Sequence, residues 1–263
     1  VFYNSNSDQL RGDLIPSEYL KRNSNYRDAK GASIRLAKDQ SVWPARINPG
    51  VNRGYRRGTL REDGKLARYT GACGPVIYRG NQFPSEYVGN AFVCEPTGNF
   101  VRRNILNESQ GAINAVNAYD RMEFLTSTDE RFRPVNAYNG PDGSLYIVDF
   151  YRGLIQHRIY LTSFLRKQIE DRGLYEPIGL GRIYRVTYKG KDAKQPPPMS
   201  SMSSAKLAKQ LGHLNGWNRS TFVTSTNGGF IFFVGFDYIG PWTICSIKCI
   251  FYQLGHNIIQ HLK

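Results

Sequence analysis

Cysteine is scarce in this 263-residue chain, which carries only Cys73, Cys94, Cys245 and Cys249. Four cysteines are too few for a disulfide-stapled scaffold, and no Cys-x-x-Cys-His motif is present to attach a c-type haem. Cys73 and Cys94 either pair across neighbouring strands or remain free buried thiols. The cysteines alone therefore leave the redox compartment open.

Acidic residues are also few. The chain has 21 Asp and Glu against 35 Lys and Arg, which gives a formal net charge of +14 and a pI near 9.7. Such a charge suits nucleic-acid binders, but the basic residues are scattered singly among Tyr, Gly and Asn. This distribution argues against a nucleic-acid partner and is compatible with an anionic ligand.

The content of apolar residues excludes a chain that is disordered throughout. Hydrophobic residues make up 40% and aromatic residues 13%, enough to build the core of one large domain or two smaller ones. The chain enters at once into Val1–Tyr3, a strand-like run with neither an initiator Met nor a signal peptide's apolar region. We interpret Val1 as lying within a longer protein.

Short apolar or aromatic runs alternate with Gly, Pro, Asn and Asp clusters as far as about residue 188, a pattern typical of a β-propeller or β-sandwich. At roughly 40 to 50 residues per blade, this length covers some four propeller blades, so further blades are expected upstream. The predicted strands are Val1–Tyr3, Gly74–Arg79, Asn90–Glu95, Phe100–Arg103, Ser144–Asp149 and Arg182–Thr187.

Two helices are predicted. Tyr160–Asp171 has apolar residues at helical spacing, Thr162 or Ser163 near its start and Gly173 just past its end. A linker rich in Pro and Ser follows over 189–203. Ser204 is then expected to cap a short amphipathic helix over Ala205–Leu211.

The amino-acid composition changes after Trp217. Thr221–Tyr252 is rich in Phe, Ile, Gly and Thr, and its only charged residues are Asp237 and Lys248. A membrane segment is one interpretation, although Asp237 and the pair at 240–241, Gly-Pro, interrupt the span that a bilayer needs. The interpretation we prefer is that the reading frame is aberrant from about Leu214.

Arg131 and Arg133 form an Arg-x-Arg pair ahead of the turn at 140–143. Residues two apart in a strand point to the same side, so the two guanidinium groups would face one anionic ligand such as a carboxylate. The alternative is that both arginines pair with the acidic residues nearby, Glu123, Asp129 or Glu130.

Several motifs, in order, resemble known oxidoreductases. Asn4–Leu10, Asn48–Tyr55 and Arg131–Arg133 leading into Gly140–Gly143 resemble the glucose/sorbosone dehydrogenase type of soluble quinoprotein propeller. The resemblance is closer to the propeller of bacterial membrane-bound dehydrogenases, in which helical (HEAT-type) repeats and a c-type haem domain follow. The motifs that carry this closer resemblance are Phe92–Asn99, Asp149–Gly153, Gly181–Val186 and the repeat-like Met202–Arg219.

The resemblance implies a mainly β fold, namely the C-terminal blades of a six-bladed β-propeller followed by the start of an α-helical repeat region. The expected domains are a partial propeller at 1–188, a linker at 189–203, the first helical repeat at 204–219 and an aberrant or hydrophobic tail at 220–263. It also implies a periplasmic or extracytoplasmic location, with membrane association left open.

The resemblance also implies a cofactor site. In the quinoprotein relatives, the arginines that match Arg131 and Arg133 hold the carboxylates of pyrroloquinoline quinone, an acidic planar cofactor. Asn52 and Arg53 are expected to line the same funnel, unless they only form a solvated turn. The further candidates follow the strand that ends at residue 149: Asp149 and Arg152 beside the cofactor, and His157 as a proton acceptor or a simple hydrogen-bonding residue.

The sequence departs from these relatives in two ways. Their general-base His and the backbone carbonyls that bind calcium precede the region that matches Val1, so this fragment alone is expected to be inactive. A basic residue that helps to hold the cofactor falls near Cys94–Thr97, where this chain has no Lys or Arg. No metal ligand is predicted within the chain.

Two functions are consistent with these observations. The first is part of an oxidoreductase that oxidises a sugar or alcohol with a quinone cofactor and passes electrons to a c-type haem domain outside this chain. The alternative is a non-catalytic propeller that binds carbohydrate or protein.

Overall fold

The computed structural model describes residues 2–13, 22, 25, 33–110, 112–196 and 198–220, together with five strands of the tail. The chain forms two compact units. Unit 1 comprises Val1–Tyr78, Glu86–Tyr138 and Leu145–Val186, and unit 2 comprises Arg79–Ser85, Asn139–Ser144 and Thr187–Lys263.

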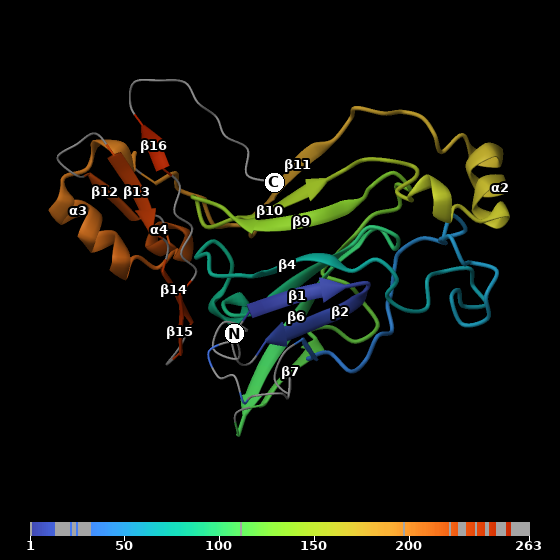
Figure 1. The fold of residues 1–263 in the computed structure, drawn as a ribbon, viewed down its shortest axis with the longest axis horizontal. Helices are drawn as coiled ribbons and strands as arrows, with labels where there is room; N and C mark the ends of the chain where they lie inside the picture. The colour runs from blue at the N-terminus through green and yellow to red at the C-terminus, as the bar shows by residue number, and fades with distance from the viewer. Residues whose placement is uncertain are drawn as a thin grey trace. The chain divides into compact units, whose positions relative to one another are not determined.

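The chain is mainly β, with several antiparallel sheets, none of them closed (Figure 1). The largest sheet runs β4-β5-β6-β7, with the short strand β8 also paired to β6. Its strands are β4 Cys73–Ile77, β5 Ala91–Glu95, β6 Phe100–Ser109, β7 Ala112–Asn117 and β8 Leu125–Thr126. This sheet is therefore a meander in which consecutive strands are neighbours.

Two three-stranded sheets flank this one along the chain. The first has the order β1-β2-β3, with β1 Phe2–Asn6, β2 Asp8–Asp13 and β3 Ile34–Arg35. The other has the order β11-β10-β9, with β9 Pro134–Asn139, β10 Leu145–Asp149 and β11 Arg182–Val186.

Each of the six predicted strands overlaps an observed strand, because all six carry apolar or aromatic runs next to clear turn residues. Among the strands of five or more residues in unit 1, β2, β7 and β9 were not predicted. The sequence of β2, DQLRGD, is mostly polar, and Asn residues interrupt the apolar residues of β7, AINAVN, and β9, PVNAYN. These strands are stabilised by pairing with neighbouring strands. For example, β7 pairs with β6 over six residue pairs, from Asn104↔Asn117 to Ser109↔Ala112.

The main core of unit 1 draws on strands and on the loop between β3 and β4. Leu10 of β2, Val93 of β5 and Phe100 of β6 pack with Leu36 and Leu66, and all five are fully buried or nearly so. Tyr69 contacts Phe100 edge to face, with ring centroids 5.6 Å apart. The long loop at 36–72 is thus part of the core.

Helix α2, Ser163–Arg172, confirms the helix predicted at 160–171. The Thr162 side chain accepts a hydrogen bond from Leu165 N–H at 3.2 Å, so the helix begins at Ser163. Gly173 ends it in the left-handed conformation at φ 58°. Tyr160, the first residue of the predicted span, belongs instead to the separate 3-10 turn η2, Arg158–Tyr160.

Unit 2 contains the short helices that follow the linker: η3 Met199–Ser201, α3 Ser204–Lys209, η4 Gln210–Gly212 and α4 Gly216–Ser220. Another 3-10 turn, η1 Ser85–Tyr87, lies between β4 and β5. The predicted cap at Ser204 is wrong. Ser203 occupies the N-cap position of α3, and its side chain makes no capping hydrogen bond.

The tail of unit 2 has a sheet of order β12-β13-β16 and a separate β14-β15 pair. These strands are Phe222–Ser225, Phe230–Val234, Phe251–Gln253, Phe236–Ile239 and Trp242–Cys245. The remaining tail residues lie outside the described part, so the expectation of an aberrant frame stays a prediction. No helix among the residues described has the length and apolarity to cross a membrane.

Candidate functional site

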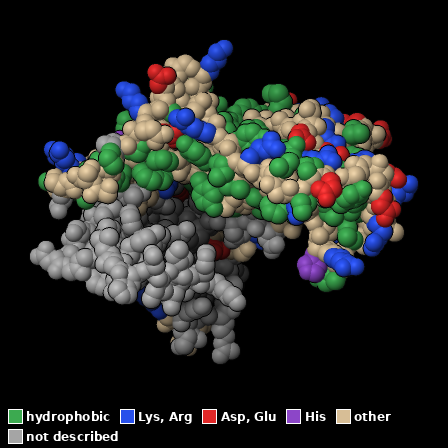
Figure 2. Space-filling model, turned by 90° about the horizontal axis from the view of Figure 1, so that it is seen from above, with side chains coloured by type: hydrophobic (Ala, Val, Ile, Leu, Met, Phe, Trp, Pro, Cys, Tyr) green, Lys and Arg blue, Asp and Glu red, His purple; other side chains and the backbone are tan. Residues whose placement is uncertain are grey.

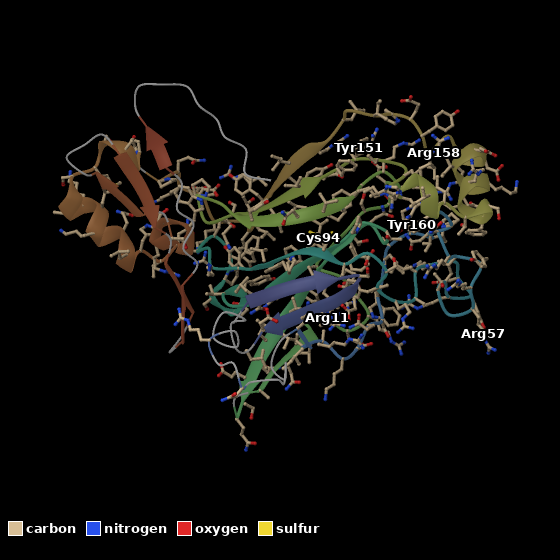
Figure 3. All side chains as sticks on the ribbon, in the orientation of Figure 1. Arg11, Arg57, Cys94, Tyr151, Arg158 and Tyr160 are labelled. Carbon is tan, nitrogen blue, oxygen red and sulfur yellow. The ribbon has the colours of Figure 1, made fainter. Side chains whose placement is uncertain are left out.

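A pocket of about 1140 Å³ lies within unit 1 and brings together segments that are far apart in the sequence. Its lining comes from Ser7, from the segments at 50–59, 70–73 and 96–97, from the residues around 133–135 and from the loop and helix at 153–165. Tyr160, labelled in Figure 3, is one of the lining residues contributed by the last of these segments. Three of the predicted site residues, Asn52, Arg53 and Arg133, line this pocket.

Arg133 is the buried cation of the pocket, with only 7% of its surface exposed. Its guanidinium group donates to three backbone carbonyls: Arg152 O at 2.8 Å, Pro96 O at 2.7 Å and Gly153 O at 2.6 Å. In the described part of the chain, no carboxylate forms an ion pair with it. The three carbonyls fix the guanidinium group, but they are neutral acceptors and do not neutralise its charge.

Burial lowers the pKa of Arg133 to about 10, and the nearby Arg46 contributes to this shift. Glu95 and Asp149 act in the opposite direction without cancelling it. The charged form is therefore disfavoured by desolvation, although Arg133 stays protonated at neutral pH. An anion in the pocket would compensate for this lost hydration.

Glu95, the last residue of β5, supports the wall of the pocket. Its carboxylate accepts hydrogen bonds from the backbone N–H groups of Thr70 at 3.2 Å, Gly71 at 2.9 Å and Thr97 at 3.1 Å, all three of which line the pocket. Burial raises the pKa of Glu95, although these N–H groups oppose the shift. Glu95 therefore has a structural role, because its carboxylate satisfies three backbone N–H groups of the pocket wall.

Asn52 positions the loop at 50–59 against α2. Its amide nitrogen donates to Tyr160 O at 3.0 Å, and its amide oxygen accepts from Thr162 N–H at 3.1 Å. Tyr55 packs edge to face on Phe164 of α2, with ring centroids 5.8 Å apart. These contacts commit the side chain of Asn52 to the protein, so its role at the pocket is to position the loop.

Arg53 and Arg56 form the rim of the pocket, and both are exposed. Neither forms an ion pair with a carboxylate among the described residues, and the Arg56 guanidinium lies 5.9 Å from the centre of the Tyr55 ring. The prediction that Arg53 lines the site is consistent with this position. Arg56 was not predicted, because nothing in its local sequence distinguishes it from the neighbouring Arg57.

The predicted pairing of Arg131 with Arg133 on one strand is wrong. Strand β9 begins only at Pro134, and the residues before it form a turn in which Phe132 N–H donates to Asp129 O at 3.2 Å. Arg131 Nε donates to Glu176 O at 3.0 Å, and Arg131 does not line the pocket. Because Arg131 lies in a turn, the strand geometry that would point both arginines to the same side does not apply.

Asp149 and Arg152 support the pocket from behind its lining. Asp149 is buried, and its Oδ1 accepts from Arg133 N–H at 2.7 Å and from Tyr151 N–H at 2.8 Å. Arg152 contributes its carbonyl to Arg133, while its own guanidinium group lies 5.7 Å from the centre of the Phe150 ring. Neither side chain is among those that line the pocket.

His157, the predicted proton acceptor, is exposed and lies outside the lining of the pocket. Its Nδ1 accepts a hydrogen bond from Ile159 N–H at 3.5 Å and so caps the turn η2. Its ring lies 5.7 Å from that of Tyr160. The structure thus gives His157 a capping contact, and a catalytic role stays a prediction.

Neither a metal-binding cluster nor a concentrated basic patch is seen in the part of the molecule that the structure and Figure 2 describe. The described residues include no group of three or more His, Cys, Asp and Glu side chains that could hold a metal ion. Figure 2 shows Lys and Arg side chains dispersed among hydrophobic ones on the face in view. This face therefore resembles the scattered distribution of charge in the sequence.

Comparison with known proteins gives one match. The model of a protein family described as a domain of unknown function, DUF7133, matches residues 1–190. No curated protein and no solved structure matches the chain.

Proposed function

Because the chain belongs to the DUF7133 family, and the matched region includes every residue that lines the pocket, we propose that this pocket binds an anionic ligand. The observation that carries the proposal is the charge of the lining. The pocket has three arginines, Arg53, Arg56 and Arg133, and no Asp or Glu among its lining residues. Such a site favours a ligand with carboxylate or phosphate groups.

The ligand class that fits best is an acidic, planar redox cofactor of the pyrroloquinoline quinone type. Its carboxylates would lie against the guanidinium groups of Arg53 and Arg56, with Arg133 contributing positive charge from the wall. When bound, such a quinone accepts two electrons from a sugar or alcohol, and a c-type haem domain outside this chain would take them up. The described residues include no group of three or more His, Cys, Asp and Glu side chains that would bind calcium.

The sheet arrangement supports placing this pocket in a β-propeller. Propeller blades are meanders of four antiparallel strands, and β4-β5-β6-β7 has that order. The strands β9, β10 and β11 form a second meander of three. We therefore propose that these sheets are blades of a propeller whose other blades lie outside this chain.

A non-catalytic binding module is the second candidate. Arg131 lies outside the pocket, and the chain has no Lys or Arg over residues 94–97. A propeller with these features would bind an acidic carbohydrate or peptide without oxidising a substrate. The two candidates share the anion site and differ in redox chemistry.

The proposal is tested by titrating the protein with pyrroloquinoline quinone and measuring binding by isothermal titration calorimetry. Removal of both rim arginines in Arg53→Ala/Arg56→Ala should weaken binding at least tenfold, since a charged hydrogen bond contributes about 1.5–3 kcal/mol. Arg131→Ala is the matched control, because it removes an arginine outside the pocket and should leave the affinity unchanged. Absence of any saturable binding, both of the quinone and of citrate as a simple tricarboxylate, would refute the anion site.

The same titration separates the two candidate functions. Binding of the quinone together with reduction of a dye acceptor when glucose is added, in a protein that includes the upstream blades, supports the oxidoreductase. Binding of citrate or of an acidic oligosaccharide without binding of the quinone supports the binding module.

A further inference from the structure

Two free thiols lie directly opposite each other on neighbouring strands at this pocket. Cys73, the first residue of β4, is the Cα partner of Cys94 in the antiparallel pairing of β4 with β5. Opposite residues in an antiparallel pair have Cα atoms about 4.5–5.5 Å apart. A disulfide needs Cα atoms about 4.4–6.8 Å apart, so the backbone is placed for a cross-link.

The two thiols differ in access. Cys73 is half-buried and lines the pocket, whereas Cys94 is fully buried. Figure 3 labels Cys94, which belongs to β5. A reagent that enters the pocket is therefore expected to react with Cys73 before Cys94.

We propose that Cys73 and Cys94 form a reversible cross-strand disulfide in the wall of the pocket. With a low-molecular-weight disulfide such as oxidised glutathione as oxidant, the Cys73 thiolate attacks one glutathione sulfur and releases one glutathione thiolate. The Cys94 thiolate then attacks the Cys73 sulfur of this mixed disulfide and releases the second. Two protein thiols are oxidised, one glutathione disulfide is reduced to two thiols, and the two protons go to the released thiolates.

The cross-link would join the two sides of the pocket wall that Glu95 already connects. Cys94 directly precedes Glu95, and Cys73 lies two residues after Gly71, whose N–H binds the Glu95 carboxylate at 2.9 Å. Oxidation would thus fix the segment at 70–73 against β5, beside the site proposed for the anion. The inference depends on the two thiols and does not rest on which ligand the pocket binds.

The rate of formation should be low. Burial raises the pKa of Cys73 to about 12 and the pKa of Cys94 well above its usual value. The attacking species is the thiolate, so exchange requires long incubation at neutral or mildly alkaline pH. The position of equilibrium depends instead on the reduction potential of the pair, which the redox buffer measures.

Peptide mapping after equilibration in glutathione buffers tests the inference. The full chain is incubated anaerobically at a series of ratios of reduced to oxidised glutathione, and the remaining thiols are then alkylated in denaturant. Trypsin cuts after Arg68, Arg79 and Arg102, so Cys73 and Cys94 fall in separate peptides, 69–79 and 80–102. The expected result is a mass equal to the two linked peptides, which rises as the buffer becomes more oxidising and is lost after reduction.

The single variants Cys73→Ser and Cys94→Ser should abolish the linked peptides, whereas the double variant Cys245→Ser/Cys249→Ser should retain them. Thermal unfolding gives an independent measure, because a native disulfide should raise the melting temperature of the oxidised chain above that of the reduced chain. Recovery of both peptides fully alkylated at the most oxidising ratio would overturn the inference. So would a glutathione adduct on Cys73 that never resolves to the linked pair.

Discussion

Arg102 and Glu123 form an ion pair in the interior of unit 1, with side chains that are only 1% and 0% exposed. Arg102 Nε donates to Glu123 Oε2 at 2.8 Å, and Glu123 Oε1 also accepts from Trp43 N–H at 2.8 Å. Burial raises the pKa of Glu123, although Arg102 opposes the shift. Each charge therefore depends on its partner, because water does not solvate either of them.

Replacing one member of this pair should lower the free energy of unfolding more than replacing both. Arg102→Met leaves the Glu123 carboxylate buried alone and should lower the free energy of unfolding by about 3–5 kcal/mol. The double variant Arg102→Met/Glu123→Leu should lose less than the single one. Urea unfolding measures both.

The exposed pair Lys167–Asp171 provides the control for this comparison. Its side chains are 73% and 49% exposed, so Lys167→Ala should change stability by less than about 0.5 kcal/mol. Equal losses in the single and double core variants would contradict the buried-pair explanation.

Arg133 and Arg131 should differ sharply on substitution, although they stand two residues apart. Arg133→Met removes a buried guanidinium group that binds three carbonyls, and we expect a loss of about 3 kcal/mol or more in the free energy of unfolding. Arg131→Met removes a partly exposed side chain and should cost less than about 1 kcal/mol. Comparable losses for the two variants, measured in denaturant, would show that the carbonyl contacts of Arg133 contribute little.

Gly74 should tolerate no side chain. Its φ is +51°, and a Cβ atom there would lie 2.5 Å from both Asn136 Cα and Val135 O. Gly74→Ala should therefore lower the melting temperature by many degrees or prevent folding, because backbone of β9 must move. Gly58→Ala is the matched control: its φ is +80°, nothing lies within 4 Å, and only about 1 kcal/mol of conformational cost is expected. A similar melting temperature for both variants would refute the steric explanation.

Alkylation of Cys73 should depend steeply on pH. Burial disfavours the thiolate and raises its pKa from 9.0 to about 12, so the rate should rise roughly tenfold per pH unit from pH 8 to pH 10 without a plateau. The raised value also means that the stability contributed by this group is present below pH 9.0 and is lost as the pH rises toward about 12. Mass spectrometry of peptide 69–79 in the Cys94→Ser variant measures the rate. A plateau near pH 9 would show that Cys73 titrates as an exposed thiol.

Local chemistry made part of the fold predictable. The turn at 140–143 and the apolar run after it predicted β10, while Thr162 or Ser163 and Gly173 predicted the ends of α2. In each case the determining residues lie within a few positions of the element they define. Elements whose boundaries depend on neighbouring residues could therefore be predicted from the sequence.

The candidate site was less predictable because it depends on distant residues. A turn places Arg131 off the strand, where it binds a carbonyl of the segment after α2. Arg133 is held by the carbonyls at 152–153. The buried partnership of Arg102 with Glu123 crosses 21 positions, and neither residue lies in a recognisable motif. Only the coarse expectation of an anion site supplied by arginines could be formed in advance.

The contact between Asn52 and Thr162 joins positions 110 residues apart. Closing so long a loop costs the unfolded chain conformational entropy, and contacts of this kind slow folding. We therefore expect the contact between the loop at 50–59 and helix α2 to form late in folding. A ligand bound in this pocket would stabilise the whole of unit 1, and binding would report how much of the protein is fully folded.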